Sequence, residues 1–124
     1  MNEPVFELSE EQRQGVEAFF ERIPFNRVLG IRIDELRGDR VVMSLPMQPE
    51  LIGNFVQGIL HGGVISSLLD VAGGAMALIG AFNKHQHLSQ PERMQRLSKL
   101  GTIDLRVDYL RPGRGQAFTA TAVL

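Results

Sequence analysis

The chain has 124 residues, a formal net charge of −1 and no cysteine. Its length suits one domain, and we expect a single domain over residues 1–124. The near-neutral charge disfavours nucleic-acid binding, and the lack of cysteine excludes disulfides, thiolate metal sites and a cysteine nucleophile. Residues 1–14 are acidic and polar, unlike a secretory signal, so we expect a cytoplasmic protein.

The N-terminal region is predicted to form a helix followed by a loop. Ser9 and Gln12 have the spacing of a capping box, and apolar residues follow at helical intervals. Pro24 is expected to end this helix, and residues 24–26 are expected to open a loop that Gly30 closes.

Two strands are predicted next. Residues 31–36 largely alternate between apolar and polar side chains, residues 41–45 are mostly apolar, and Gly38-Asp39 between them is typical of a turn. We therefore expect two antiparallel strands. Residues 46–58 contain Pro49 and Gly53 and predict an irregular loop.

The longest apolar segment extends from Gly62 to Phe82, and from Val64 onward its only charge is Asp70. Its length approaches that of a membrane-spanning helix. A carboxylate near the middle would cost about 2.5–3.5 kcal/mol on insertion, and the flanking strands need a helix to cover them. We therefore expect a helix buried on nearly all sides and no insertion into a membrane.

The C-terminal region is predicted to contain one more helix and two strands. Residues 89–100 favour a polar, amphipathic helix, and residues 102–110 alternate like a strand with one wet face. Residues 111–115 predict a turn, and residues 117–124 a final strand. Because this sheet would be thin with an open edge, we expect further strands after it or a partner chain that covers the edge.

The strongest chemical signal lies at the start of the long helix. Gly62 and Gly63 let a ligand approach the first N–H groups, which suit a carbonyl oxygen that becomes an oxyanion. Asp70 is a carboxylate in apolar surroundings, and such a group is either satisfied structurally or functional. We interpret Asp70 as a base or nucleophile; a glycine-rich helix entry with a structural carboxylate is the alternative.

Helical spacing bears on how these groups could cooperate. Gly62 and Asp70 are about 12 Å apart along the axis, too far to act on one carbonyl. An antiparallel second copy of the helix would bring one group to the other, which predicts two composite sites at a two-fold interface. Gly63, Ser66 and Ser67 lie near the face of Asp70 and are candidate substrate-binding residues.

The sequence resembles the PaaI-type hotdog-fold acyl-CoA thioesterases. Their motif is His-Gly-Gly with an acidic residue nine positions after the His, as for His61 and Asp70. Four blocks within residues 20–124 resemble the YigI-like branch: residues 24–27, 53–54, 59–65 and 101–115.

The resemblance implies an α+β hotdog fold, a long central helix wrapped by an antiparallel β-sheet. It also implies homodimers or dimers of dimers, and hydrolysis of medium- to long-chain acyl-CoA without a metal or other cofactor. Members often carry an Asn or Gln six residues before the His, where this chain has Phe55; Asn54 and Gln57 are the candidates to position water. His61 is expected to hold the turn rather than act as a base.

The sequence also offers alternative roles for other polar residues and two rival functions. Arg111 and Arg114 are candidates for binding CoA phosphates, or are solvated turn charges. His85 and His87 are expected to be solvated rather than a metal pair. A hotdog hydratase or dehydratase is one rival function, although its catalytic His in another context is not found. A non-catalytic acyl-CoA sensor is another, and it stays an alternative because Phe55 stands where family members often have Asn or Gln.

Overall fold

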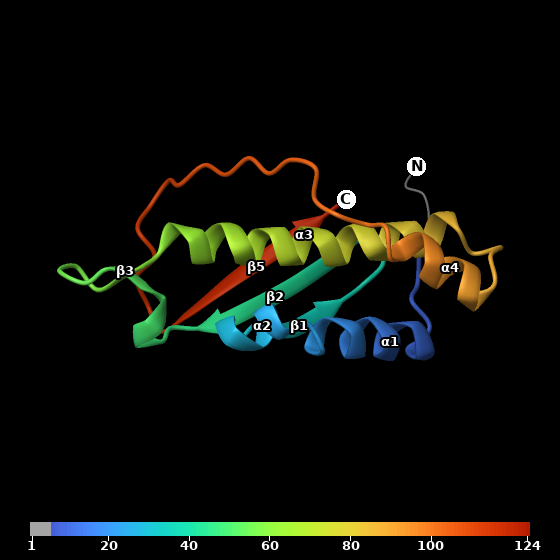
Figure 1. Cartoon of the computed structure of the whole chain (residues 1–124), viewed down its shortest axis with the longest axis horizontal. Helices are drawn as coiled ribbons and strands as arrows, with labels where there is room; N and C mark the ends of the chain where they lie inside the picture. Colours follow the sequence, from blue (N-terminus) through green and yellow to red (C-terminus); the bar gives the residue numbers. More distant parts are fainter. Residues whose placement is uncertain (1–5) are drawn as a thin grey trace.

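The computed structural model describes residues 6–124, apart from the side chain of Leu97. Part of the expectation for the N-terminus therefore falls on residues 1–5, outside the described residues. A long helix lies across an antiparallel sheet, with two shorter helices beyond one sheet edge and one at the far end of the long helix (Figure 1). The elements are α1 (Glu10–Glu21), α2 (Pro24–Leu29), β1 (Arg32–Leu36), β2 (Arg40–Pro46), the 3-10 helix η1 (Pro49–Leu51), β3 (Ile52–Asn54), β4 (Ile59–Leu60), α3 (Gly62–Lys84), α4 (Gln90–Leu97) and β5 (Ala117–Val123).

The capping box at the start of α1 is confirmed. The Ser9 hydroxyl accepts from the Gln12 N–H at 3.1 Å, and the Ser9 N–H donates to the Gln12 side chain at 3.0 Å. The predicted loop after Pro24 is wrong, because these residues form α2. Proline is favourable in the first turn of a helix, and Gly30 ends α2 at a φ of 74°.

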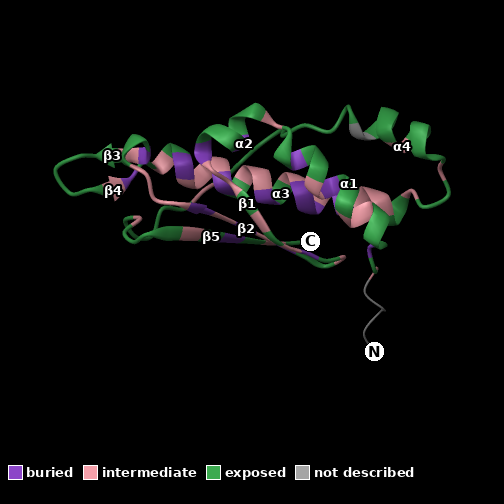
Figure 2. Ribbon diagram, turned by 90° about the horizontal axis from the view of Figure 1, so that it is seen from below, coloured by how far each residue is buried: buried purple, intermediate pink, exposed green. Residues whose placement is uncertain are grey.

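The sheet has the strand order β1-β2-β5, and both pairs are antiparallel. Alternate side chains of β2 point toward α3: Val41, Met43 and Leu45 are at most 1% exposed. They pack in one core with buried residues of α3, among them Ile79, as Figure 2 shows by colour. The core thus fixes α3 against the sheet through non-directional apolar packing.

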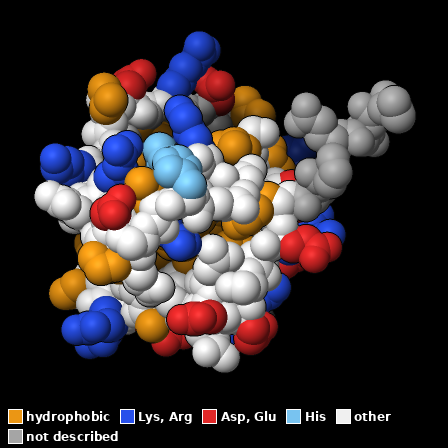
Figure 3. Space-filling model, turned by 90° about the vertical axis from the view of Figure 1, so that its right-hand side faces the viewer, with side chains coloured by type: hydrophobic (Ala, Val, Ile, Leu, Met, Phe, Trp, Pro, Cys, Tyr) orange, Lys and Arg blue, Asp and Glu red, His pale blue; other side chains and the backbone are white. Residues whose placement is uncertain are grey.

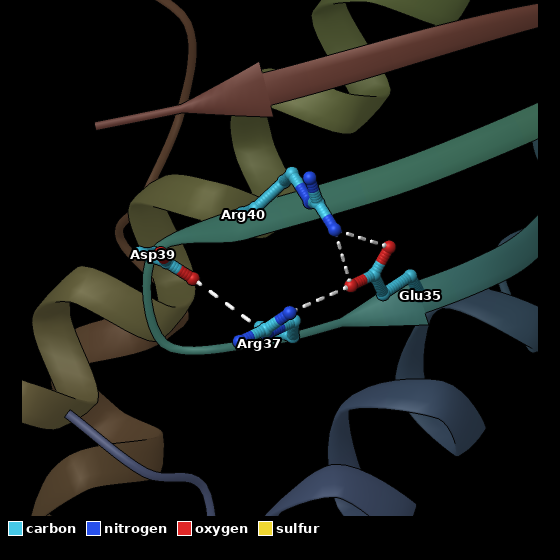
Figure 4. Close-up of polar contacts among 4 residues, drawn as sticks. All are labelled: Glu35, Arg37, Asp39 and Arg40. Atoms are coloured by element: carbon cyan, nitrogen blue, oxygen red, sulfur yellow. Dashed lines mark hydrogen bonds and ion pairs between the residues drawn. The ribbon is translucent and has the colours of Figure 1, made fainter. Parts of the chain in front are cut away.

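The predicted turn between β1 and β2 is confirmed and carries a cluster of charges (Figure 4). Arg40 donates to both oxygens of Glu35 at 2.8 and 3.0 Å, and Arg37 lies 3.5 Å from the same carboxylate. The hydrogen bond from Arg40 lowers the pKa of Glu35. The cluster closes the hairpin at its exposed end.

The prediction of an irregular loop over residues 46–58 is wrong. It contains η1 and a two-stranded sheet, in which Ile52 pairs with Leu60 and Asn54 pairs with Ile59. The intervening turn extends past the N-terminal end of α3 in both ribbon views (Figures 1 and 2). Sequence patterns missed these strands because they are only two and three residues long.

The long helix α3 is confirmed, but it is not buried on all sides. Gly63, Leu69 and Gly73 are exposed, whereas Ala72, Ala75 and other residues facing the sheet are buried. By length and composition α3 could cross a membrane, as could many core helices of soluble proteins. One side of the helix thus remains open in the single chain.

The strand predicted for residues 102–110 is absent. Residues 101–114 arch along α3 without a strand partner, and β5 pairs only with β2 within the described part of the chain (Figure 1). The alternating pattern fits an extended backbone, but a strand also requires a neighbouring backbone for its hydrogen bonds. The polar helix predicted after Ser89 is confirmed as α4, with the Ser89 hydroxyl at its N-terminus.

Candidate active site

His61 caps the N-terminus of α3, as the sequence predicted for a turn-holding role. Its Nδ1 accepts a hydrogen bond from the Gly63 N–H at 2.8 Å. A neutral imidazole that accepts at Nδ1 carries its proton on Nε2. His61 therefore satisfies one of the unpaired N–H groups of the first turn and fixes the direction in which the helix starts.

Gly62 keeps its N–H unpaired. Among the described residues no acceptor takes this N–H, and a methyl group on Gly62 would lie 3.3 Å from Cε1 of Tyr109. The Tyr109 ring therefore packs beside the glycine. The combination leaves one backbone donor at the positive end of the α3 dipole, which suits an oxyanion.

Gly53 explains why the β3–β4 hairpin can approach this helix end. A Cβ atom on Gly53 would lie 2.7 Å from the Cα atom of His61, a distance that no side chain tolerates. The His61 N–H also donates to the Leu51 carbonyl at 2.8 Å. The hairpin thus places His61 directly at the start of α3.

The hairpin turn engages both residues that were candidates to position water. The Asn54 side-chain oxygen accepts from the Val56 and Gln57 N–H groups, each at 3.1 Å. Arg114 donates to the Gln57 carbonyl at 3.2 Å and to its side-chain oxygen at 2.5 Å. These contacts build a fixed turn, at which Phe55 is 88% exposed.

Ser66 and Ser67 both bond within the helix. Their hydroxyls donate to the Gly63 carbonyl at 3.1 and 2.7 Å. Hydroxyl donation to a carbonyl one turn earlier is a local arrangement that leaves the oxygen lone pairs free. The structure therefore brings the serines to Gly63 and not to a catalytic His.

Asp70 is half-buried and has a partner that sequence reasoning missed. The Thr102 hydroxyl donates to Asp70 Oδ1 at 2.6 Å, from the segment that was predicted to be a strand. One carboxylate oxygen is thereby fixed while Oδ2 stays available. Thirty-two positions separate the two residues, and nothing in their spacing predicts the contact.

Within one chain, the catalytic candidates do not converge. Asp70 and Gly62 are about 12 Å apart along α3 by helical rise. Beyond Asp70, a Cβ atom on Gly73 or Gly74 would meet nothing within 4 Å, so this side of the helix is open. The geometry therefore leaves room for another molecule beside Asp70.

The remaining polar candidates lie elsewhere. Arg111 is exposed and forms no ion pair among the described residues. The rings of His85 and His87 are 6.2 Å apart, and partial burial together with Arg96 and Lys84 lowers the pKa of His85. Within residues 6–124 there is no group of three His, Cys, Asp or Glu arranged to hold a metal ion.

Comparison with known proteins identifies the fold family. Residues 57–124 match the model of the thioesterase superfamily. The chain is 49% identical over 108 residues to the medium/long-chain acyl-CoA thioesterase YigI of Escherichia coli, covering 87% of this chain and 70% of the relative.

Solved structures agree. A thioesterase-superfamily protein from Shewanella oneidensis has a TM-score of 0.82 and 49% identity, covering 88% of this chain and 71% of that one. The Escherichia coli PaaI protein, at 24% identity, shares the fold with a TM-score of 0.65, covering 90% of this chain and 68% of its own. This chain therefore belongs to the thioesterase superfamily and has its hotdog fold.

Proposed function

We propose that this chain hydrolyses medium- to long-chain acyl-CoA thioesters in sites shared between two copies. The observation that carries the proposal is the combination of a Gly62 N–H at a helix start, which has no acceptor among the described residues, and an Asp70 carboxylate held by Thr102 on the same helix. The similarity to a medium/long-chain acyl-CoA thioesterase supports the substrate class. The working protein is a soluble, cytoplasmic homodimer or dimer of dimers.

The thioester carbonyl oxygen accepts a hydrogen bond from the Gly62 N–H. As charge develops on this oxygen, the helix dipole and the unpaired N–H stabilise it more strongly than they stabilise the neutral carbonyl. His61 keeps the first turn in place through Gly63. Removal of such a donor from other enzymes costs about a hundredfold or more in rate.

Asp70 of a second copy supplies the other half of the chemistry. It either takes a proton from water that attacks the carbonyl carbon, or attacks that carbon itself to form an anhydride that water then opens. In both routes the carbon–sulfur bond breaks, the CoA sulfur receives a proton, and the products are a free fatty acid and CoA. No metal or redox group enters either route.

Thr102 acts through Asp70 as a positioning residue. Its hydroxyl fixes Oδ1, so Oδ2 points in one direction toward the water or the carbonyl carbon. Catalysis depends on such orientation, since small misplacements cost large factors in rate. Gln57 and Asn54 contribute by holding the hairpin turn next to the site, and Arg111 is available to a CoA phosphate.

A thiol-release assay across a chain-length series tests the substrate class. We expect dodecanoyl- and hexadecanoyl-CoA to exceed both acetyl-CoA and phenylacetyl-CoA in kcat/KM. Each buried methylene adds about 0.8 kcal/mol of apolar transfer energy, so longer chains bind more tightly until they extend beyond the apolar surface that buries them. A preference for an aryl thioester would show that the proposed acyl class is wrong. Binding of acyl-CoA without turnover would favour the non-catalytic sensor.

Heterodimers test the shared site. Gly62→Pro removes the N–H, and proline is compatible with the first position of a helix. Asp70→Asn removes the carboxylate. Each substitution therefore inactivates both sites of its own homodimer. Mixed dimers of these two inactive variants contain one intact composite site and should regain part of the activity. If subunit exchange is demonstrated and no activity returns, each site lies within one chain.

A further inference from the structure

A second hollow lies at the opposite end of α3 from the histidine and glycines. A cavity of about 500 Å³ lies between α1, the C-terminal end of α3 and α4. Figure 3 views this end of the molecule, where hydrophobic side chains lie between charged ones. None of the candidate catalytic or substrate-binding residues lines the cavity.

The cavity wall is mainly apolar. Val16 and Leu78 form buried parts of the wall, at 1% and 6% exposure, whereas Phe19 and Met94 are 49% and 51% exposed. Phe82 of α3 completes the apolar set. Large apolar side chains left half-exposed around a hollow favour an apolar occupant, because burial of their surface is favourable.

Polar side chains also contribute to the wall. Glu11 and Gln12 come from the first turn of α1, and Gln90 and Arg93 come from α4. The Arg93 Nε donates to the Leu88 carbonyl at 3.2 Å, which holds α4 in place. Because a glutamate and an arginine both line the cavity, its charges do not select an anion.

The cavity lies along the same helix as Asp70. Leu78 and Phe82 follow Asp70 by eight and twelve residues, which corresponds to about 12 and 18 Å along the axis. The intervening helix surface is open at Gly73 and Gly74, where an added Cβ would meet nothing within 4 Å. A linear chain that starts at Asp70 can therefore follow α3 and bend around it toward Leu78.

We infer that this cavity receives the far end of a long acyl chain whose thioester lies at Asp70. The inference rests on the proposed function and adds the residues that set chain length. Chains too short to reach the cavity gain nothing from it. Each methylene that enters it should improve affinity about fourfold, the factor that corresponds to burial of one methylene.

Gly15 offers a sharp test because it lines the cavity from α1. An added Cβ there meets nothing within 4 Å, so Gly15→Leu would place its side chain in open space. Leucine also favours a helix interior more than glycine does, so the variant should fold. Ala18→Leu is the matched control, an exposed position of α1 that does not line the cavity.

The experiment compares kcat/KM for hexanoyl- and hexadecanoyl-CoA. Gly15→Leu should lower the value for hexadecanoyl-CoA about fifteenfold, because its side chain displaces about two methylenes, and should leave hexanoyl-CoA unchanged. Met94→Gln, a polar change at an exposed wall position, should act in the same direction, and Ala18→Leu should change neither substrate.

An unaltered chain-length profile in both Gly15→Leu and Met94→Gln would overturn the assignment of the cavity while leaving the hydrolase intact. An equal loss for both substrates would overturn it too, since the cavity would then serve stability rather than recognition. Failure of the wild-type protein to hydrolyse any acyl-CoA would overturn the proposed function together with this inference.

Discussion

The two ends of α3 differ in the physics that organises them. At the N-terminal end, short hydrogen bonds fix single atoms: His61 Nδ1 at 2.8 Å from the Gly63 nitrogen, and Thr102 at 2.6 Å from Asp70. At the C-terminal end, Leu78 and Phe82 border a mainly apolar cavity of about 500 Å³, and the hydrogen bonds of Gln12 and Arg93 in its wall hold the ends of α1 and α4 in place. Directional hydrogen bonds thus organise one end of α3, and non-directional apolar contacts organise the other.

The difference predicts two kinds of variant. Hydrogen bonds that hold reacting atoms act on every substrate with the same thioester, so losses at the N-terminal end should be independent of chain length. Apolar contacts act only on the methylenes that reach them, so losses at the cavity should grow with chain length. Chain-length profiles therefore separate the two ends.

Asp70→Asn should have the largest effect. We expect kcat to fall at least about a hundredfold, to a similar extent for hexanoyl- and hexadecanoyl-CoA, because loss of acid–base catalysis costs that much or more. Thiol-release kinetics on the folded oligomer measure it. Near wild-type turnover would remove Asp70 from the mechanism.

Gly62→Pro should rank next, with a loss of about a hundredfold in kcat through removal of the oxyanion donor. Gly62→Ala is the matched variant that keeps the N–H, although its methyl group would press on Tyr109 at 3.3 Å. We expect the alanine variant to retain clearly more activity. Equal activity in the two variants would show that this N–H does not stabilise the transition state.

Thr102→Val should lower kcat about tenfold with little change in KM, since the variant keeps the Asp70 carboxylate but no longer directs it, and the substrate contacts persist. Thr102→Ser keeps the hydroxyl and should restore most of the rate. Parallel measurements of kcat and KM distinguish this from a structural role. A valine variant that is as active as the serine variant would argue against positioning.

Glu35→Gln should have the smallest effect and serves as a control away from both ends. The folded-state pKa of Glu35 is lowered by Arg40, so its contribution to stability is present above the unfolded value of 4.5 and is lost as pH falls through the folded value. The wild-type advantage in Tm should be measurable at neutral pH and shrink under acid. Chain-length preference should not change, and a changed profile would mean that general destabilisation mimics the cavity variants.

Local signals predicted the elements that depend on local interactions. Ser9 and Gln12 cap α1 as expected, and the apolar run produced α3, because capping and helical spacing act within a few residues. The first helix ends before Pro24, as predicted, but Pro24 also begins α2 in place of the expected loop, since a proline can follow one helix and start the next. A strand pattern at residues 102–110 could not provide the neighbour that a ladder needs.

The sequence alone determined the His61–Gly63 helix start, the position of Asp70 nine residues later and the family to which they point. Their distances follow from helix geometry, which is local and regular. Only the tertiary structure decided that Thr102 bonds Asp70, that Arg114 clamps Gln57, and that α1 and α4 enclose a cavity. These contacts join residues 32 and 57 positions apart, where chain spacing carries no information and packing alone decides which side chains meet.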